Sequence, residues 1–277
     1  MGDYIMTENN TMTATSATPL RASDYPMMNH VLLTLPAWEP ARLAADLLTT
    51  WHINSGPIPS DMNEPWLFHA NGSLVVIGLE RHPVPDGIAT HAAANSPDWP
   101  DAKEVAQSHL AHLAVAVIAE TASLVENART AMKVLASLCE DPSVRAISAA
   151  GRLFAPEVYR RGALMMQGNE RAFPIFNVVG FGLWRRSEES PLSGFTIGLD
   201  HFGVPEVEVI EGNLGPRETQ SILVAAAVHQ IESGRAFAEG ETVTLGEKDW
   251  DVSRRTSEAL GVITTHLVRH ASMATEL

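Results

Sequence analysis

The sequence predicts an α+β fold of two ferredoxin-like (βαββαβ) halves joined by a helix. Strand-like and helix-like segments follow one another in the order β-α-β-β-α-β, and the same order recurs later in the chain. An Asn-Gly pair between two apolar runs adds a hairpin signal to the first half. We therefore expect antiparallel or mixed sheets with the helices packed on one face.

The first half is expected over residues 28–122, after a leader at 1–27 without periodicity that we expect to be disordered. Asn71–Gly72 predicts a two-residue type I′ turn, because that turn needs positive φ at both positions. The pattern predicts helices at 39–51 and 101–110, and strands at 29–35, 66–70, 73–80 and 112–119.

A connecting helix is expected at 123–142, where Ser123 and Glu126 form a capping box. The second half is expected over 143–271. The pattern predicts helices at 156–167 and 216–232, strands at 144–150, 173–184, 195–202, 205–211 and 241–246, and an edge strand at 262–268.

The net charge of −14 bears on which partners the chain can bind. Adjacent basic residues occur only as Arg160–Arg161, Arg185–Arg186 and Arg254–Arg255, without extension into a run. Nucleic-acid binders carry a basic face or stripe, so we expect no nucleic-acid binding. An acidic surface favours partners of opposite charge, which indicates a protein with a basic surface.

Targeting and membrane-spanning patterns are missing from the sequence. The first residues lack the basic and apolar regions of a secretory signal, and no apolar run reaches about 18 residues. We therefore expect a cytoplasmic protein that does not enter a membrane. The single cysteine, Cys139, excludes an intramolecular disulfide and lies among apolar residues, which predicts burial.

Metal-binding and nucleotide-binding motifs are incomplete. His109 and His112 are three residues apart, but the expected helix ends near 110 and no third ligand follows at a suitable spacing, so we expect no metal. Gly180–Gly182 lacks the third glycine of a dinucleotide fingerprint and lies inside an expected strand. We interpret these glycines as a bend or as room for a packed helix, and we expect no cofactor and no catalytic residues.

Two groups of residues are candidate binding sites. Glu206 and Glu208 are two apart in an expected strand and would share one face, and the pair Glu188–Glu189 lies in an expected loop. These four carboxylates are candidates for partner binding, or they are structural and solvated residues. The second group is a possible anion pocket, or a helix face, formed by Arg152, Tyr159, Arg160 and Arg161.

The segment at 195–208, FTIGLDHFGVPEVE, resembles the central signature of a bacterial family of uncharacterised proteins, domain of unknown function 4261. The segments at 151–157 and 240–246 fit the same family, and the similarity is best over about residues 144–255. The resemblance implies no catalytic residues. It implies a small acidic protein of the kind that acts as an immunity or accessory protein in bacterial toxin or secretion systems.

The function that follows from these observations is that of a non-catalytic, cytoplasmic, protein-binding protein. The negative charge and the incomplete catalytic motifs support it. The alternative is an enzyme or a small-ligand binder with a pocket between the two halves, where pockets often form.

Overall fold

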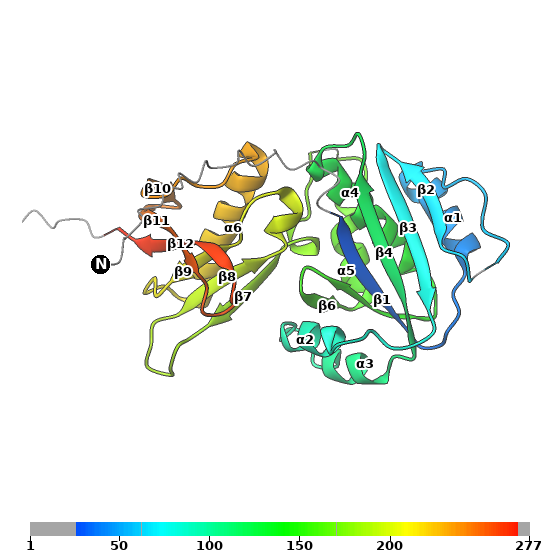
Figure 1. Ribbon diagram of the computed structural model, residues 1–277, viewed down its shortest axis with the longest axis horizontal. Helices are drawn as coiled ribbons and strands as arrows, with labels where there is room; N and C mark the ends of the chain where they lie inside the picture. Colours follow the sequence, from blue (N-terminus) through cyan, green and yellow to red (C-terminus); the bar gives the residue numbers. More distant parts are fainter. Residues whose placement is uncertain (1–25, 62, 170, 271–277) are drawn as a thin grey trace, which may run out of the picture.

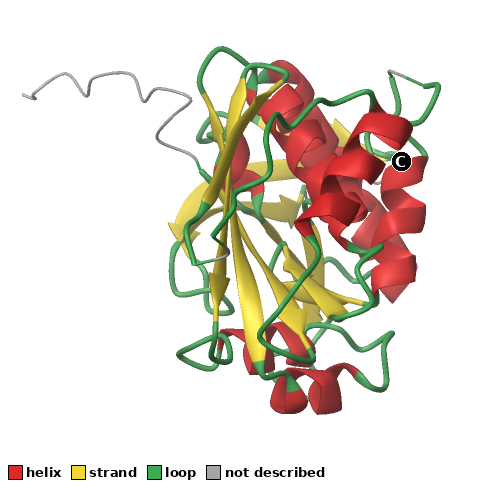
Figure 2. Ribbon diagram, turned by 90° about the vertical axis from the view of Figure 1, so that its right-hand side faces the viewer, coloured by secondary structure: helices red, strands yellow, loops and turns green. Residues whose placement is uncertain are grey.

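The computed structural model describes residues 26–61, 63–169 and 171–270. Two six-stranded sheets lie side by side, and the longer helices gather on one face of both (Figures 1 and 2). One sheet is antiparallel and the other is mixed, which confirms the predicted α+β class. Most of the expected leader, at 1–25, lies outside the described residues, and the first strand already begins at Met27.

The first sheet has the strand order β2-β3-β4-β1-β5-β6, and each neighbouring pair is antiparallel. Its strands are β1 (Met27–Leu33), β2 (Trp66–Ala70), β3 (Ser73–Glu80), β4 (Ala111–Ala119), β5 (Val144–Ala149) and β6 (Arg152–Phe154). Three helices cover one face: α1 (Pro40–Trp51), α4 (Leu124–Leu138) and α5 (Pro156–Leu164).

Two local signals in this part of the chain are confirmed. Asn71 and Gly72 both have positive φ, 51° and 78°, in the turn that joins β2 to β3. Ser123 caps α4, since its hydroxyl accepts a hydrogen bond of 3.2 Å from the N–H of Glu126.

The ferredoxin-like strand order is wrong for this sheet. That motif places its first two strands parallel, with a third strand between them, because the first helix crosses over the sheet. Here the pairings β1–β4, β4–β3 and β3–β2 are all antiparallel, so β2 runs antiparallel to β1. The helices between β3 and β4, α2 (Ile88–Ala94) and α3 (Ala102–Ser108), are short and pack together at one end, so β4 returns beside β3.

The first sheet and its helix layer also contain elements that were expected in the connecting helix and in the second half. The strand expected to open the second half, β5, pairs with β1, and Val31 faces Ile147 in this register. Helix α4, expected to connect the halves, packs on α1, α5 and β4. Both elements therefore belong to the core of the first sheet.

The second sheet has the strand order β10-β11-β12-β9-β8-β7. Its strands are β7 (Gly180–Trp184), β8 (Ser193–Ile197), β9 (Val207–Ile210), β10 (Thr242–Leu245), β11 (Lys248–Thr256) and β12 (Ile263–Arg269). Helix α6 (Pro216–Ser233) packs on β7, β8 and β9. Strand β12 lies between β11 and β9 and is parallel to β9, so its expected edge position is wrong. The sequence pattern did not predict β11, which occupies the position next to it.

Two expected strands are replaced in part by short 3₁₀ helices. The expected strand at 173–184 begins only at Gly180, after η2 (Ile175–Asn177). The expected strand at 195–202 ends at Ile197, because Gly198 has a φ of 108° and starts η3 (Leu199–Phe202).

One hydrophobic cluster runs through both halves. The ring of Phe173 packs edge-on against that of Phe202, with centroids 6.0 Å apart, and α4 contacts η3. A smaller cluster under α2 and α3 buries Leu32, Ala146 and Leu153 on the other face of the first sheet. Within the described residues, no helix combines the length and apolar character needed to cross a membrane.

Candidate functional site

A cavity of about 530 Å³ lies between the two sheets. Residues of β1, β5 and the neighbouring α2 line one side of it. The other side, next to the second sheet, is lined by Ile197, Gly198, Asp200, His201 and Glu206. This volume is within the usual range for a small-molecule site, about 300–1,000 Å³.

The cavity is bordered by backbone in unusual conformations. Asp86 and Ala150 have φ values of 56° and 51°, and each precedes a glycine that also has positive φ. A Cβ on Gly151 would lie 3.0 Å from Cγ2 of Ile197, so this turn of the first sheet touches the second sheet closely. Positive φ at residues other than glycine is uncommon and clusters at functional sites.

The lining of the cavity is acidic and rich in imidazole. Its titratable residues are Asp86, Asp200, Glu206, His30, His91 and His201. Among the described residues that line it, there is no lysine or arginine. Burial, and then the neighbouring His112, lower the pKa of His30, so this imidazole is neutral at pH 7. The cavity is therefore electronegative at neutral pH.

Glu206 forms part of the cavity wall. Its carboxylate accepts hydrogen bonds from the hydroxyl of Thr196 at 2.6 Å, and from the N–H groups of Gly198 and Leu199 at 2.6 and 2.9 Å. Burial raises the pKa of Glu206 although these hydrogen bonds favour the charged form. Glu206 thus anchors the start of η3 and is not an open surface carboxylate.

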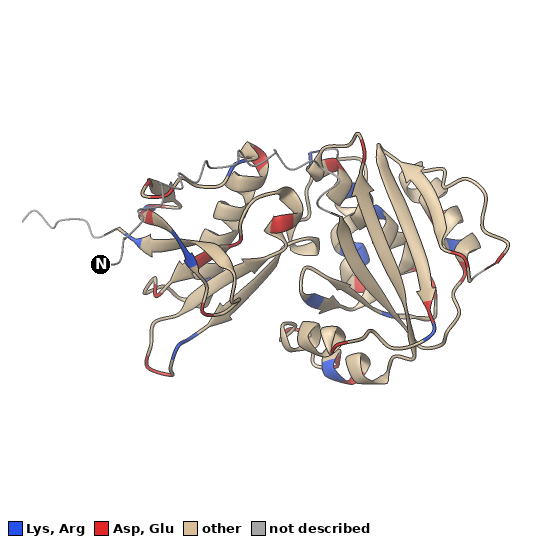
Figure 3. Ribbon diagram, in the orientation of Figure 1, with Lys and Arg blue, Asp and Glu red and all other residues tan. Residues whose placement is uncertain are grey.

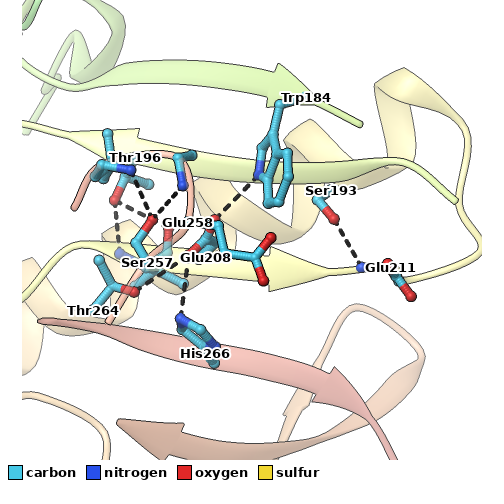
Figure 4. Close-up of polar contacts among 12 residues, drawn as sticks. Trp184, Ser193, Thr196, Glu208, Glu211, Ser257, Glu258, Thr264 and His266 are labelled. Atoms are coloured by element: carbon cyan, nitrogen blue, oxygen red, sulfur yellow. Dashed lines mark hydrogen bonds and ion pairs between the residues drawn. The ribbon is translucent and has the colours of Figure 1, made fainter. Parts of the chain in front are cut away.

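Glu208, in β9, is fully buried and has a separate set of hydrogen-bond partners (Figure 4). Its carboxylate accepts a hydrogen bond from Nε1 of Trp184 at 3.1 Å and one from Thr264 at 3.4 Å, and it lies 3.2 Å from Nε2 of His266. Burial lowers the pKa of His266, against the opposing effect of Glu208. Of the two expectations for Glu206 and Glu208, partner binding or a structural role, these contacts favour the structural role, because both carboxylates accept hydrogen bonds from donors within the fold.

Glu188 and Glu189 lie where the sequence placed them, exposed in the loop between β7 and β8. Figure 3 shows acidic and basic residues next to one another in this protruding loop. The adjacent Arg186 forms ion pairs with Glu211 at 2.9 Å and with Glu258 at 2.8 Å.

The four residues of the expected anion pocket do not converge. Tyr159 is buried, and Arg161 is exposed on α5. Arg160 pairs with both carboxylate oxygens of Asp46 at 2.9 and 3.0 Å. Arg152 alone lines a cavity, a second one between the sheets. Because Tyr159, Arg160 and Arg161 are consecutive residues of α5, their side chains point in different directions around the helix and do not meet.

The residues singled out for metal and cofactor binding have structural partners. Nε2 of His109 accepts a hydrogen bond of 2.8 Å from the N–H of Val84, and within the described residues no group of three potential ligands is placed to hold a metal ion. A Cβ on Gly180 would lie 2.4 Å from the carbonyl oxygen of Ala150. The close neighbour of Gly180 is therefore a turn of the first sheet and not a packed helix. Burial raises the pKa of the Cys139 thiol to about 12, which makes it a poor nucleophile.

The fold and the cavity define an α+β protein with a polar site between two sheets. Residues 195–262 match a family model described as Domain of unknown function (DUF4261), so this segment of the chain is identified with that family. The predicted resemblance at 195–208 and 240–246 falls inside the matched segment, and 151–157 falls outside it. No curated protein and no solved structure matches the chain.

Proposed function

We propose that the chain binds a small, positively charged molecule in the larger cavity between the two sheets. The observation that carries this proposal is the lining, which contains three carboxylates and three imidazoles but no lysine or arginine among the described residues. The start of the family-matched segment supplies one wall of this cavity, through Ile197, Gly198, Asp200, His201 and Glu206.

An alkylammonium group suits this lining because it offers three hydrogen-bond donors and no acceptor. The carboxylates of Asp86 and Asp200 accept such bonds, and both residues are exposed enough for a ligand to reach them. The nearby His201 adds an imidazole whose Nδ1 lies 3.2 Å from the carbonyl oxygen of Gly198. A hydrogen bond to a charged group contributes about 1.5–3 kcal/mol, or roughly tenfold or more in affinity.

A matched pair of probes tests this proposal. Binding of 1,4-diaminobutane and of the neutral 1,4-butanediol is measured by calorimetry at low salt. We expect the diamine to bind about tenfold or more tightly than the diol. The double variant Asp86→Asn/Asp200→Asn should lose this preference, whereas Glu188→Gln/Glu189→Gln, with the same charge change on an exposed loop, should keep it. Equal binding of the two probes, or equal effects of the two double variants, would refute the proposal.

A second candidate is binding to a protein with a basic surface, as an immunity or accessory protein in the cytoplasm. The exposed Glu188 and Glu189 in the protruding β7–β8 loop favour it, together with the net charge of −14. Electrostatic steering raises association rates by roughly 10–10³-fold and is screened by salt.

Association with a purified basic partner, measured by stopped flow, distinguishes this second function. Between about 0.1 M and 1 M salt, where the Debye length falls from about 10 Å to about 3 Å, association should slow by roughly tenfold. Glu188→Lys/Glu189→Lys should slow it further at low salt. The control Glu232→Lys/Glu247→Lys reverses the same charge at exposed positions elsewhere. A rate that does not depend on salt would exclude the electrostatic mechanism.

A further inference from the structure

A second cavity between the sheets, of about 350 Å³, has the opposite electrostatic character. It borders Ile197, as the larger cavity does, but its polar lining includes Arg152 and Arg217, with Asn95 and Gln220 beside them. Two rings, Phe181 and Phe195, complete an apolar side. Its charged residues are the two arginines and Asp98, which leaves it electropositive in a chain of net charge −14.

Arg152 is largely buried and only weakly paired. Its side chain is only 16% exposed, and its Nε has no hydrogen-bond partner. The carboxylate nearest to its guanidinium is that of Asp98, at a long 3.5 Å and on a side chain that is 90% exposed. The guanidinium also lies 5.6 Å from the ring centroid of Phe154. A guanidinium has five N–H donors, and a largely buried charge is stabilised by a close negative partner, so this environment favours binding of an anion.

Arg217 adds a second positive charge to this cavity. It is exposed and follows Pro216, the first residue of α6, which has no side-chain cap. The N–H groups of a first helical turn lack partners within the helix, and they favour negative charge. The positive charge of Arg217 and this helix start therefore act in the same direction as Arg152.

We propose that this second cavity binds the oxyanion, carboxylate or phosphate, of a small molecule that also carries an apolar ring. Arg152 binds two oxygens of the anion with its planar fork of donors, Arg217 adds a second charge, and the two phenyl rings contact the apolar part. The charged residues of this cavity differ from those of the larger one, so the anion site stands or falls independently of the proposed function.

Three probes of similar size test the site by calorimetry: phenyl phosphate, benzoate and the neutral benzyl alcohol. We expect phenyl phosphate, benzoate or both to bind about tenfold or more tightly than benzyl alcohol. The tighter of the two anions identifies the oxyanion as phosphate or carboxylate. If neither anion binds more tightly than benzyl alcohol, the proposal is wrong.

Three variants locate the binding. Arg217→Gln removes a charge at an exposed position and should weaken the tighter anion roughly three- to tenfold. Arg152→Lys keeps the charge but loses the fork, and should weaken it about tenfold. The control Arg161→Gln makes the same charge change as Arg217→Gln on the exposed side of α5 and should leave binding unchanged. If Arg161→Gln and Arg217→Gln have equal effects, the anion is responding to net charge and the proposed site is wrong. Thermal unfolding of each variant shows whether it folds. If Arg152→Lys does not fold, Arg217→Gln still tests the site.

Discussion

The turn between β2 and β3 allows the backbone and the packing cost of one methyl group to be separated. Gly72 has a φ of 78°, and a Cβ at this position would lie 2.6 Å from Oγ1 of Thr121 and 2.9 Å from the backbone nitrogen of Ala122. Gly56 has a similar φ of 70°, but nothing lies within 4 Å of its Cβ position. Replacing each glycine with alanine therefore imposes the same backbone cost and a different steric cost.

The two costs are known approximately. Left-handed backbone costs about 1–2 kcal/mol for an L-residue, so Gly56→Ala should lose that amount. Overpacking adds about 1–3 kcal/mol. The backbone of Thr121 and Ala122 cannot move away freely, because the N–H groups of both residues donate hydrogen bonds of 2.9 and 3.0 Å to the carbonyl of Gly72. Gly72→Ala should therefore lose about 2–5 kcal/mol in total. Gly72→Val, which is β-branched, should lose at least as much.

Urea unfolding of the wild type and both alanine variants measures the difference. We expect both midpoints to fall with little change in slope, and that of Gly72→Ala to fall about twice as far. In thermal unfolding, each 1 kcal/mol corresponds to roughly 2–4 °C for a chain of about this size. Equal losses at the two glycines would show that the turn does not rest against residues 121–122, and the hairpin packing described above would be incorrect.

Three further predictions concern buried polar contacts and the approach of the two sheets. Hydrogen bonds from Arg160 hold the pKa of Asp46 below its usual value, in spite of the opposing effect of burial. Arg160→Met should therefore lower the free energy of unfolding by about 1–3 kcal/mol at pH 7. Urea unfolding at several pH values should show that the difference between variant and wild type shrinks below about pH 4, because Asp46 is then protonated in the unfolded chain. Glu208→Ala leaves the half-buried indole N–H of Trp184 and the buried hydroxyl of Thr264 without their acceptor, and should cost about 1–3 kcal/mol in chemical unfolding. An unchanged midpoint would contradict the network in Figure 4. Gly180→Ala should lower the melting temperature of the whole chain, since its Cβ would meet the carbonyl of Ala150 in the other sheet, and an unchanged temperature would show that the two sheets do not touch there.

Local elements could be predicted from the sequence, because their signals lie within a few residues. Pro40 and Pro216 begin α1 and α6, and Ser123 caps α4, as their positions indicated. Strand pairing depends on contacts between distant residues, and an order of elements such as β-α-β-β-α-β is compatible with several strand orders. For this reason the pairing of β5 with β1 and the central position of β12 could not be predicted.

The candidate sites show the same division between local and distant information. The exposure of Glu188 and Glu189 followed from a loop signal. The burial of Glu208 did not follow from its sequence neighbours, since its partners come from β7 and β12. Arg152 and Arg217 carry no common motif, and they line one cavity only because two separate sheets meet there. A pocket between two halves could be expected from the sequence, but no spacing pattern identifies the residues that line it.

The contact of Gly151 with Ile197 lies beside the wall that the two cavities share. Ile197 borders both of them, and so does α2, through Ala92 in the larger cavity and Ala94 in the smaller one. If a ligand in one cavity shifts these shared elements, the free energy of binding in the other cavity changes. Linkage requires the effect to be reciprocal: if an oxyanion changes the affinity for an amine by some factor, the amine changes the affinity for the oxyanion by the same factor. The protein would then report the joint presence of two ligands of opposite charge.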